Sequence, residues 1–547
     1  MSHRMFHSVI AKIKSALPPI PVAVSMLTVV IVFSWFVTEG SWQFTASLQP
    51  GFRQFYDAQA ASLLQGRLDV PPETIGYEAF VYQGKTFGYF GIGPSLLRIP
   101  LNFLFPSLWG RWNALFLLAG CITNLLAIYW LYREISRWAG ADSSHFNGTQ
   151  RLDGWFSFLI LVFGLGSTNL FLSSHASIYH EPIILGGAFC LSSILAYLKF
   201  IRSPSPGPFI GMVLFGFLTF FTRITFGASV LILIGALLVI LCIQKWLPSF
   251  AKKLKRRMRG ASTPRGEQGS ENLAVPGGQM LALDERSLAG YISALLLFFI
   301  FVIGLYAWVN QTKFGTWMDD HSYKNYPAVS SSSERYQRTQ GGKTFFIQNF
   351  PMMSSFYFFP LDSQTTKDFP PFLSNRINQA RFPEAHWDWL EATIPVPFSM
   401  PFELILACVG LFSLFKVKQS RFMLLLVLVT ALNVLLMLFF NSISQRYEHE
   451  FFPFLVLSGT LGFIHLTGKM AALKKPFKTA LLAAFLVLGL ISIYQSFAIT
   501  FNDQRTGSFL VTPARRAELQ KISSDANQEL IVIWRSAKEL LQPLRSH

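Results

Sequence analysis

Residues 51–100 read GFRQFYDAQAASLLQGRLDVPPETIGYEAFVYQGKTFGYFGIGPSLLRIP and form the first long hydrophilic stretch of the chain, between two apolar runs. The stretch contains Asp57, Asp69, Glu73 and Glu78, and it is dense in Tyr, Phe, Gly and Pro. A simple tether between two helices needs far fewer residues, and long ordered loops are uncommon and usually functional. We therefore expect this stretch to form half of a functional site that is held against a bilayer.

The composition is that of a membrane protein. Of the 547 residues, 51% are hydrophobic and 14% are charged, whereas about 25% of the residues in a soluble domain are charged. Apolar runs of about 20 residues recur along the chain, and this length crosses ~30 Å of hydrocarbon. The expected fold is therefore all-α and polytopic.

The formal net charge of +17 is explained by membrane topology. Most of the bases stand in short loops beside apolar runs, where they set the orientation of the chain and attract anionic lipid. We therefore expect membrane lipids, and no nucleic acid, among the partners. The four cysteines lie inside or at the ends of apolar runs without metal-ligand spacing, and we expect them to be small buried apolar residues.

Basic loops alternate with loops that are poor in bases, which predicts about eleven membrane-spanning helices. The run Phe209–Ile243 is too long for one span, and we split it at residues 222–225. The other expected spans are Pro19–Thr38, Trp112–Leu131, Trp155–Leu172, Glu181–Phe200, Leu288–Val309, Pro401–Phe415, Phe422–Phe440, Phe451–Leu466 and Ala480–Ile499. Gln54–Gln65 is expected to form a short amphipathic helix, and Ser95–Phe105 a short interfacial or re-entrant segment.

These spans divide the chain into four parts. Residues 1–309 form an N-terminal transmembrane module, which includes the first outer loop at 41–110 and a basic cytoplasmic linker at 244–286. Residues 310–395 form a second outer segment, residues 396–499 form the C-terminal transmembrane helices, and residues 500–547 form an outer helical tail. The sequence shows no tandem repeat of the kind that would mark an inverted-repeat transporter.

Unusual polar residues fall on the outer side of this topology. Ionisable groups at membrane depth are costly and tend to mark function. Together they offer a carboxylate as general base, arginines as a phosphate clamp and aromatic rings as stacking surfaces. The residues are Asp57, Glu78, His180, Glu181, Arg223, Asp319, Asp320, Arg446, Tyr447 and Glu450.

A sugar on a polyprenyl phosphate already carries a good leaving group, so its transfer needs one base to deprotonate an acceptor hydroxyl. Glycosidases, by contrast, need two carboxylates. The sequence contains no P-loop, no GxSxG and no Asp-x-Asp motif in a polar context, which favours a lipid-linked donor over a nucleotide sugar. No zinc ligand spacing occurs. No cofactor is expected, although a divalent cation bound by acids is left open.

Several motifs resemble those of the GT-C superfamily of integral-membrane glycosyltransferases. They are YDAQAASLLQGRLDV and YQGKTFGYFGIGPSLLRIP in the first outer loop, His180-Glu181 at a helix start, FGTWMDDHSY after an outward span, and RYEHEFFP before a late one. Within the superfamily, the chain is most similar to users of polyprenyl-phosphate sugars, such as protein O-mannosyltransferases and lipid A aminoarabinose transferases. The resemblance covers roughly residues 1–470.

This resemblance implies inverting transfer of a sugar to a hydroxyl of a glycan, lipid or protein acceptor. It also implies an active site on the periplasmic side of a bacterial inner membrane. The family places its catalytic acid near the start of a short helix in the first outer loop, and this position corresponds to Asp57. Many relatives have two adjacent acids there, whereas this chain has Tyr56-Asp57-Ala58.

Each candidate residue also has a simpler interpretation. Asp57 is either the base or a helix-capping acid, and Glu78 is either its stand-in or a solvated loop acid. His180 and Glu181 either contact the donor or acceptor or are satisfied by backbone amides at a helix start. Arg223 is either a phosphate clamp or a snorkelling residue.

The pair Arg446 and Tyr447 has the same donor-binding interpretation, and Glu450 is expected to pair with Arg446. The aromatic residues of the segment 310–395 form either a carbohydrate-stacking surface or an interfacial belt. Two other functions are left open. One is a polymerase or ligase that joins lipid-linked saccharides, and the other is a lipid or solute transporter.

Overall fold

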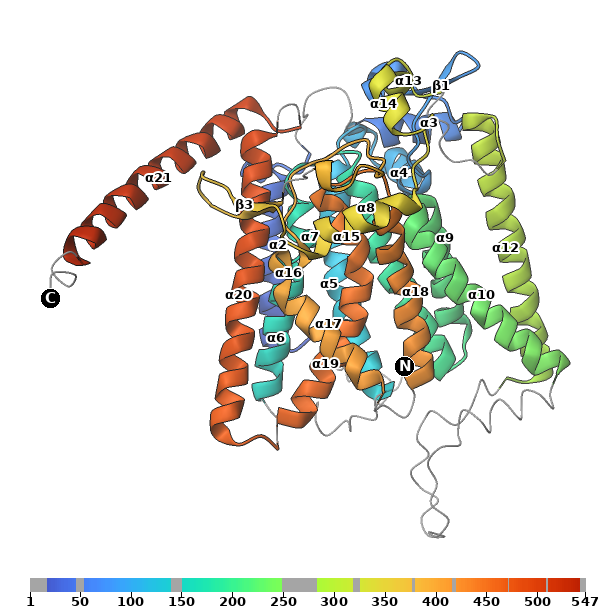
Figure 1. Cartoon of the computed structure of the whole chain (residues 1–547). Helices are drawn as coiled ribbons and strands as arrows, with labels where there is room; N and C mark the ends of the chain where they lie inside the picture. Colours follow the sequence, from blue (N-terminus) through green and yellow to red (C-terminus); the bar gives the residue numbers. More distant parts are fainter. Residues whose placement is uncertain are drawn as a thin grey trace, which may run out of the picture.

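The computed structural model describes residues 17–45, 54–138, 150–247, 283–317, 325–375, 379–415, 420–470, 472–507 and 510–541. These residues form an all-α bundle with two small antiparallel hairpins, β1–β2 and β3–β4 (Figure 1). The long elements are α2 (Ile20–Val37), α5 (Asn113–Trp138), α6 (Gln150–Leu165), α8 (His180–Arg202), α9 (Pro206–Thr222), α10 (Ile224–Trp246), α12 (Glu285–Phe314), α17 (Pro401–Leu414), α18 (Ser420–Phe439), α19 (Phe452–Met470), α20 (Lys475–Thr506) and α21 (Pro513–Leu541).

The short elements lie mostly between these helices. They are α3 (Phe55–Leu63), η1 (Pro72–Thr74), η2 (Gly76–Glu78), β1 (Phe80–Tyr82), β2 (Lys85–Phe87), α4 (Gly93–Leu104), η3 (Pro106–Leu108), α7 (Thr168–Phe171), α13 (Pro327–Ser330), α14 (Ser333–Arg338), η6 (Ile347–Asn349), α15 (Phe350–Phe358), β3 (Ser363–Thr365), β4 (Leu373–Asn375), η7 (Gln379–Arg381), α16 (Val396–Ser399) and η8 (Gln445–Phe451).

Eight of the described helices are long and apolar enough to cross a membrane, and three shorter apolar helices accompany them. The prediction of an all-α polytopic membrane protein is confirmed, whereas the count of eleven spans stays a prediction. The expected split of Phe209–Ile243 is also present, because α9 ends at Thr222 and α10 begins at Ile224. Arg223 between them has an extended backbone, with φ −149° and ψ 109°.

One expected span is interrupted. The apolar run Trp155–Leu172 forms α6, which ends at Leu165, and then the separate short helix α7. The hydroxyl of Ser167 accepts a hydrogen bond from the backbone N–H of Asn169 and so caps α7. This cap starts a new helix within an apolar run, which hydropathy alone does not reveal.

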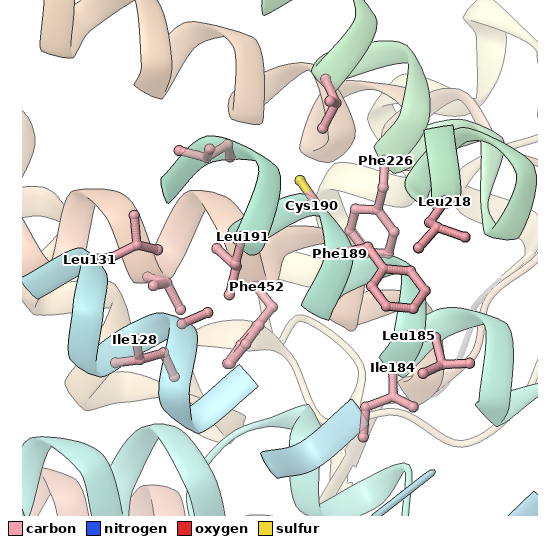
Figure 2. Packing of buried hydrophobic residues seen from close by; sticks show 14 of the residues in the cluster. Ile128, Leu131, Ile184, Leu185, Phe189, Cys190, Leu191, Leu218, Phe226 and Phe452 are labelled. Atoms are coloured by element: carbon pink, nitrogen blue, oxygen red, sulfur yellow. The ribbon is translucent and has the colours of Figure 1, made fainter. Parts of the chain in front are cut away.

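The helix α8 lies at the centre of the bundle. In the most apolar 18-residue stretch of α8, 83% of the residues are buried inside the protein. The corresponding share for α12 is 28%, and this helix lies at the edge of the bundle in Figure 1. Figure 2 shows side chains of α8 packed between neighbouring helices, with Ile128 and Leu131 of α5 on one side and Leu218 and Phe226 of α9 and α10 on the other. The central position of α8 fixes its first residues, His180 and Glu181, inside the protein.

Close helix contact also occurs between α17 and α19. A Cβ atom at Gly410 would collide with the carbonyl oxygen of Ser458, and one at Gly462 would collide with that of Leu406. Small residues allow two backbones to approach in this way, as is common between helices in membranes.

The loops gather at the upper end of the bundle in Figure 1, where α3, α4, β1, α13 and α14 lie together. The expected short helix at Gln54–Gln65 is present as α3, but it is not amphipathic, because seven of its nine residues are buried. The expected short segment at Ser95–Phe105 forms the helix α4, which buries Arg98 and exposes Phe103; its interfacial or re-entrant position stays a prediction. The hairpin β1–β2 turns at Gln83 and Gly84, both at positive φ.

Some sequence expectations lie outside the described residues. Asp319 and Asp320 lie there, and so do residues 248–282 of the basic linker.

Candidate active site

A cavity of about 830 Å³ lies at the end of the bundle where the loops gather. Its walls come from the first loop, the junction of α9 and α10, the last turns of α12, the segment 325–395, and the start of η8. Four of the predicted site residues line it: Glu78, Arg223, Arg446 and Tyr447. Ligand sites commonly have volumes of about 300–1,000 Å³, so the cavity is large enough for a sugar phosphate.

Glu78, at the end of η2, contributes a carboxylate to the wall. The phenol of Tyr179 donates a hydrogen bond to its Oε1 at 3.0 Å, and Tyr326 also hydrogen-bonds to it. Among the described residues, none brings a cation within ion-pair distance of Glu78, whereas the other acids on this wall do have such partners. Burial raises the pKa of Glu78, although the two phenols and nearby arginines oppose this. Such a carboxylate is suited to accept a proton.

Arg223 is held at the junction of α9 and α10 by an acid from η8. Its Nε donates to Glu450 Oε1 at 2.6 Å, and Thr225 Oγ1 donates to the other carboxylate oxygen at 2.8 Å. The guanidinium carbon lies 5.6 Å from the centre of the Tyr447 ring. The expected pair of Arg446 with Glu450 is therefore wrong, because Glu450 is fully buried beside Arg223.

Two further arginines of the cavity have carboxylate partners from the segment 325–395. Arg446 Nη1 donates to both carboxylate oxygens of Glu391, at 3.0 and 2.8 Å. Its guanidinium carbon lies 5.3 Å from the centre of the Tyr179 ring. Arg335 donates to Asp388 through Nε and Nη2, at 2.8 and 2.9 Å. The positive charge of each arginine is thus offset by a carboxylate.

Asp57 belongs to a separate, closed network. Its Oδ2 accepts from Arg98 Nε at 3.1 Å, and its Oδ1 accepts from Asn102 Nδ2 at 3.0 Å. Arg98 also donates to both oxygens of Glu181, at 2.5 and 2.9 Å, and Asn113 Nδ2 donates to Glu181 at 3.0 Å. Asp57, Arg98 and Glu181 are all 0% exposed.

This network changes the interpretation of two predicted site residues. Asp57 and Glu181 do not line the cavity, and both carboxylates are bound by the single guanidinium of Arg98 rather than by a helix cap or backbone amides. Burial by itself would lower the pKa of Arg98, but the Glu181 and Asp57 carboxylates raise it and keep the guanidinium charged. The catalytic role of Asp57 stays a prediction.

His180 lies apart from both clusters. Its Nδ1 is 3.1 Å from the carbonyl oxygen of Leu172, and its ring stacks on His175 with 3.9 Å between ring centres. The Nε2 of His175 is 3.4 Å from a carboxylate oxygen of Asp503. His180 does not line the cavity, and its donor-binding role stays a prediction.

The aromatic residues of the second outer segment are dispersed. Tyr326 and Trp389 line the cavity, and 56% of Trp389 is exposed. The others lie elsewhere, with Tyr357 in an apolar core, Trp387 against Arg338, Trp317 at the surface, and Tyr323 outside the described residues. The stacking interpretation therefore applies at most to Tyr326 and Trp389.

A divalent cation would need several ligand side chains close together. Within the ranges that the structure describes, no three His, Cys, Asp or Glu side chains come together as a metal cluster. The cavity acids Asp388 and Glu391 are each bound to an arginine. The described residues therefore offer no preformed cation site.

Several residues of the two clusters were not assigned a role from the sequence. Arg98 stands inside the stretch 51–100, in SLLRIP, but the sequence does not say whether its side chain points into the protein or toward solvent. Glu391 and Asp388 stand in an irregular segment without periodicity, and Arg335 belongs to the short helix α14. Lys313 was the best available signal, because it follows an apolar span directly and an ammonium at membrane depth is unusual.

The fold and the cavity define an all-α integral membrane protein with a polar, aromatic-lined chamber at one end of its bundle. No family model matches the chain. No curated protein matches it either.

Solved structures from Archaeoglobus fulgidus are similar to the chain. They include an oligosaccharyltransferase in the apo form (TM-score 0.42, 10% identity, 88% of this chain and 55% of that chain) and in complex with Zn and sulfate (0.41, 11%, 86% and 53%). Another is the oligosaccharyltransferase AglB with an inhibitory peptide and a dolichol-phosphate (0.45, 10%, 90% and 56%). The chain thus spans about half the length of these proteins. At these scores the likeness assigns this chain no substrate and no site residue.

Proposed function

We propose that the chain is a glycosyltransferase that moves a sugar from a polyprenyl-phosphate donor to a hydroxyl of a glycan, lipid or protein acceptor, with inversion. The observation that carries this proposal is the cavity itself. At the end of a transmembrane bundle it combines a carboxylate with no cation partner among the described residues, several cations and aromatic side chains. These are the groups that a phosphate-linked sugar and an attacking hydroxyl require.

We propose Glu78 as the general base. The acceptor hydroxyl gives its proton to the Glu78 carboxylate while its oxygen bonds to the anomeric carbon. The bond between that carbon and the phosphate oxygen breaks, and the lipid phosphate leaves as a monoester. Asp57 is less suited to this role, because both of its oxygens already accept hydrogen bonds inside a buried network.

The paired arginines are suited to bind neutral groups. Arg223 and Arg446 have carboxylate partners, so they offer N–H donors with little net charge. We propose that they donate to hydroxyls of the sugar, while Tyr447 and Trp389 present ring faces to it. The GT-C resemblance and the outer placement of the acids favour a site on the periplasmic side of a bacterial inner membrane.

The lipid product tests this proposal. The purified full-length protein in lipid nanodiscs would be given polyprenyl-phosphate mannose, glucose or arabinose together with an extracted cell-envelope fraction as acceptor. Mass spectrometry would follow the lipid. We expect release of polyprenyl monophosphate with at least one donor, and none from the Glu78→Gln variant.

Other products would point to the competing functions. Release of a polyprenyl diphosphate from oligosaccharide-diphosphate lipids alone would indicate a polymerase or ligase. Movement of an intact donor across proteoliposomes without bond cleavage would indicate a transporter. Either result would reject transfer from a monophosphate lipid.

A further inference from the structure

The cations of the cavity differ in how their charge is offset. Arg223, Arg335 and Arg446 each contact a carboxylate. Lys313, in the last turn of α12, also lines the cavity, is 1% exposed, and has no carboxylate partner among the described residues. Among the cavity cations that the structure describes, Lys313 is therefore the one without a carboxylate within ion-pair distance.

Backbone carbonyls occupy two donors of Lys313. Its Nζ donates to the carbonyl oxygens of Gly88 at 2.9 Å and Phe90 at 2.8 Å. An ammonium group has three N–H donors, so one remains. A buried charge that is solvated only by two dipoles is costly, and a bound anion would remove that cost. The position of Lys313 is fixed by the end of α12, which Gly315 closes in the left-handed conformation with φ 74°.

Two unsatisfied polar side chains lie in the same part of the wall. Asn310 precedes Lys313 by about one helical turn, is 3% exposed, and its Nδ2 has no hydrogen-bond partner among the described residues. Thr222, at the end of α9, is 2% exposed, and its Oγ1 also lacks a partner there. Both residues line the cavity. A buried donor without a partner is unfavourable, which points to a ligand with acceptor atoms.

The glycines of the FGIGP stretch bring these groups together. A Cβ atom at Gly91 would collide with the carbonyl oxygen of Phe221, and one at Gly93 would collide with Thr222 Oγ1. The start of α4 therefore packs directly on the end of α9. The carbonyls that hold Lys313 belong to the residues just before this contact, so Lys313 and Thr222 approach the same turn from two helices.

We propose that Lys313, Asn310 and Thr222 form the subsite that binds the phosphate group of the lipid donor. This inference rests on the proposed function and assigns the phosphate to Lys313 rather than to the charge-paired arginines. A phosphate monoester or diester supplies the negative charge that Lys313 lacks and the acceptor oxygens that Asn310 Nδ2 and Thr222 Oγ1 lack.

Binding measurements with defined probes test the subsite. The full-length protein in detergent would be titrated with a polyprenyl monophosphate, the corresponding polyprenol, and inorganic phosphate, with native mass spectrometry as readout. We expect the monophosphate lipid to bind the wild-type chain about 10- to 100-fold more tightly than the alcohol. Lys313→Met should remove this difference and leave the affinity for the alcohol unchanged. Lys85→Met, at an exposed position of the hairpin β1–β2, should keep the difference.

Further arms separate the alternatives. If Lys313→Met does not fold, Asn310→Asp provides the test, because a carboxylate there should weaken binding of the monophosphate lipid and not of the alcohol. Tight binding of inorganic phosphate alone would indicate a free-anion site and overturn the assignment to a lipid. Unchanged binding of the monophosphate lipid in a folded Lys313→Met chain would overturn the subsite, while leaving the proposed function intact. No binding of any polyprenyl monophosphate to the wild-type chain would reject both.

Discussion

Two carboxylates from the first loop, Glu78 and Asp57, have opposite environments in the folded chain. Asp57 is fully buried, and its oxygens are bound by Arg98 and Asn102. Glu78 is half-buried beside the cavity and is held by phenols rather than by a cation. Hydrogen bonds from Arg98 and Asn102 hold the Asp57 carboxylate in one geometry, whereas Glu78, which pairs with no cation among the described residues, keeps the basicity that proton transfer needs.

The two acids of the first loop therefore have different roles, one in supporting the site and one in the proposed reaction. The Asp57 network ties α3 and α4 to the first turn of α8, since Arg98 reaches both acids. Tyr56 beside Asp57 packs on Phe90 of the cavity wall, with 6.2 Å between ring centres. The network thus lies directly behind the wall that carries Glu78, and we interpret it as the support of the site rather than its reacting part.

The largest expected effect is on the proposed base. Glu78→Gln keeps the shape and the acceptor for the Tyr179 phenol but cannot take a proton, and we expect kcat to fall about 10²–10⁴-fold with the protein still folded. Asp57→Asn should lower stability but keep the kcat of the folded fraction within about tenfold. Both are measured as release of polyprenyl monophosphate. Abolished transfer in a folded Asp57→Asn chain, with transfer retained in Glu78→Gln, would return the base to Asp57.

The next effect concerns the closed network. Arg98→Met leaves Asp57 and Glu181 buried without their cation, and removing one partner of a buried ion pair costs about 3–5 kcal/mol. We therefore expect a large fall in the thermal unfolding midpoint in detergent. Arg67→Met removes an arginine that pairs with Asp69 at the surface and serves as the control, with little expected change. Similar midpoints for the two variants would contradict a supporting role for the Arg98 network.

The smallest effect is on the pH profile. Because burial raises the pKa of Glu78, its carboxyl group is protonated over a wider acidic range than usual. A base must be deprotonated, so transfer should be full above the raised pKa and fall about tenfold for each pH unit below it. The profile of kcat against pH checks this. An acid limb at or below about pH 4.3, the ordinary value for Glu, would contradict it, and the limb should persist in Asp57→Asn.

Most of the bundle could be predicted because membrane insertion is decided by local properties. The split at Arg223 and the ends of α8, α10 and α17 follow from apolar length and from the bases and prolines at their borders. The break between α6 and α7 could not be predicted, because a serine cap inside an apolar run does not change the hydropathy.

The site was predicted less completely. Glu78, Arg223, Arg446 and Tyr447 meet in the cavity, as the outer placement of polar residues suggested. The partners of these residues, Glu450, Glu391 and Tyr179, come from parts of the chain far apart in sequence. Periodicity and spacing do not say which distant side chains will contact one another.

The sequence by itself determined that this chain crosses a membrane many times and collects acids, arginines and aromatic rings at the ends of its spans, because hydrophobicity and charge act along the chain locally. Only the tertiary structure decided which charges are satisfied. Arg98 occupies Asp57 and Glu181, while Glu78 and Lys313 are left without ionic partners among the described residues. The reason is physical, since the state of a buried charge depends on the groups within a few ångströms of it, and folding alone brings those groups together.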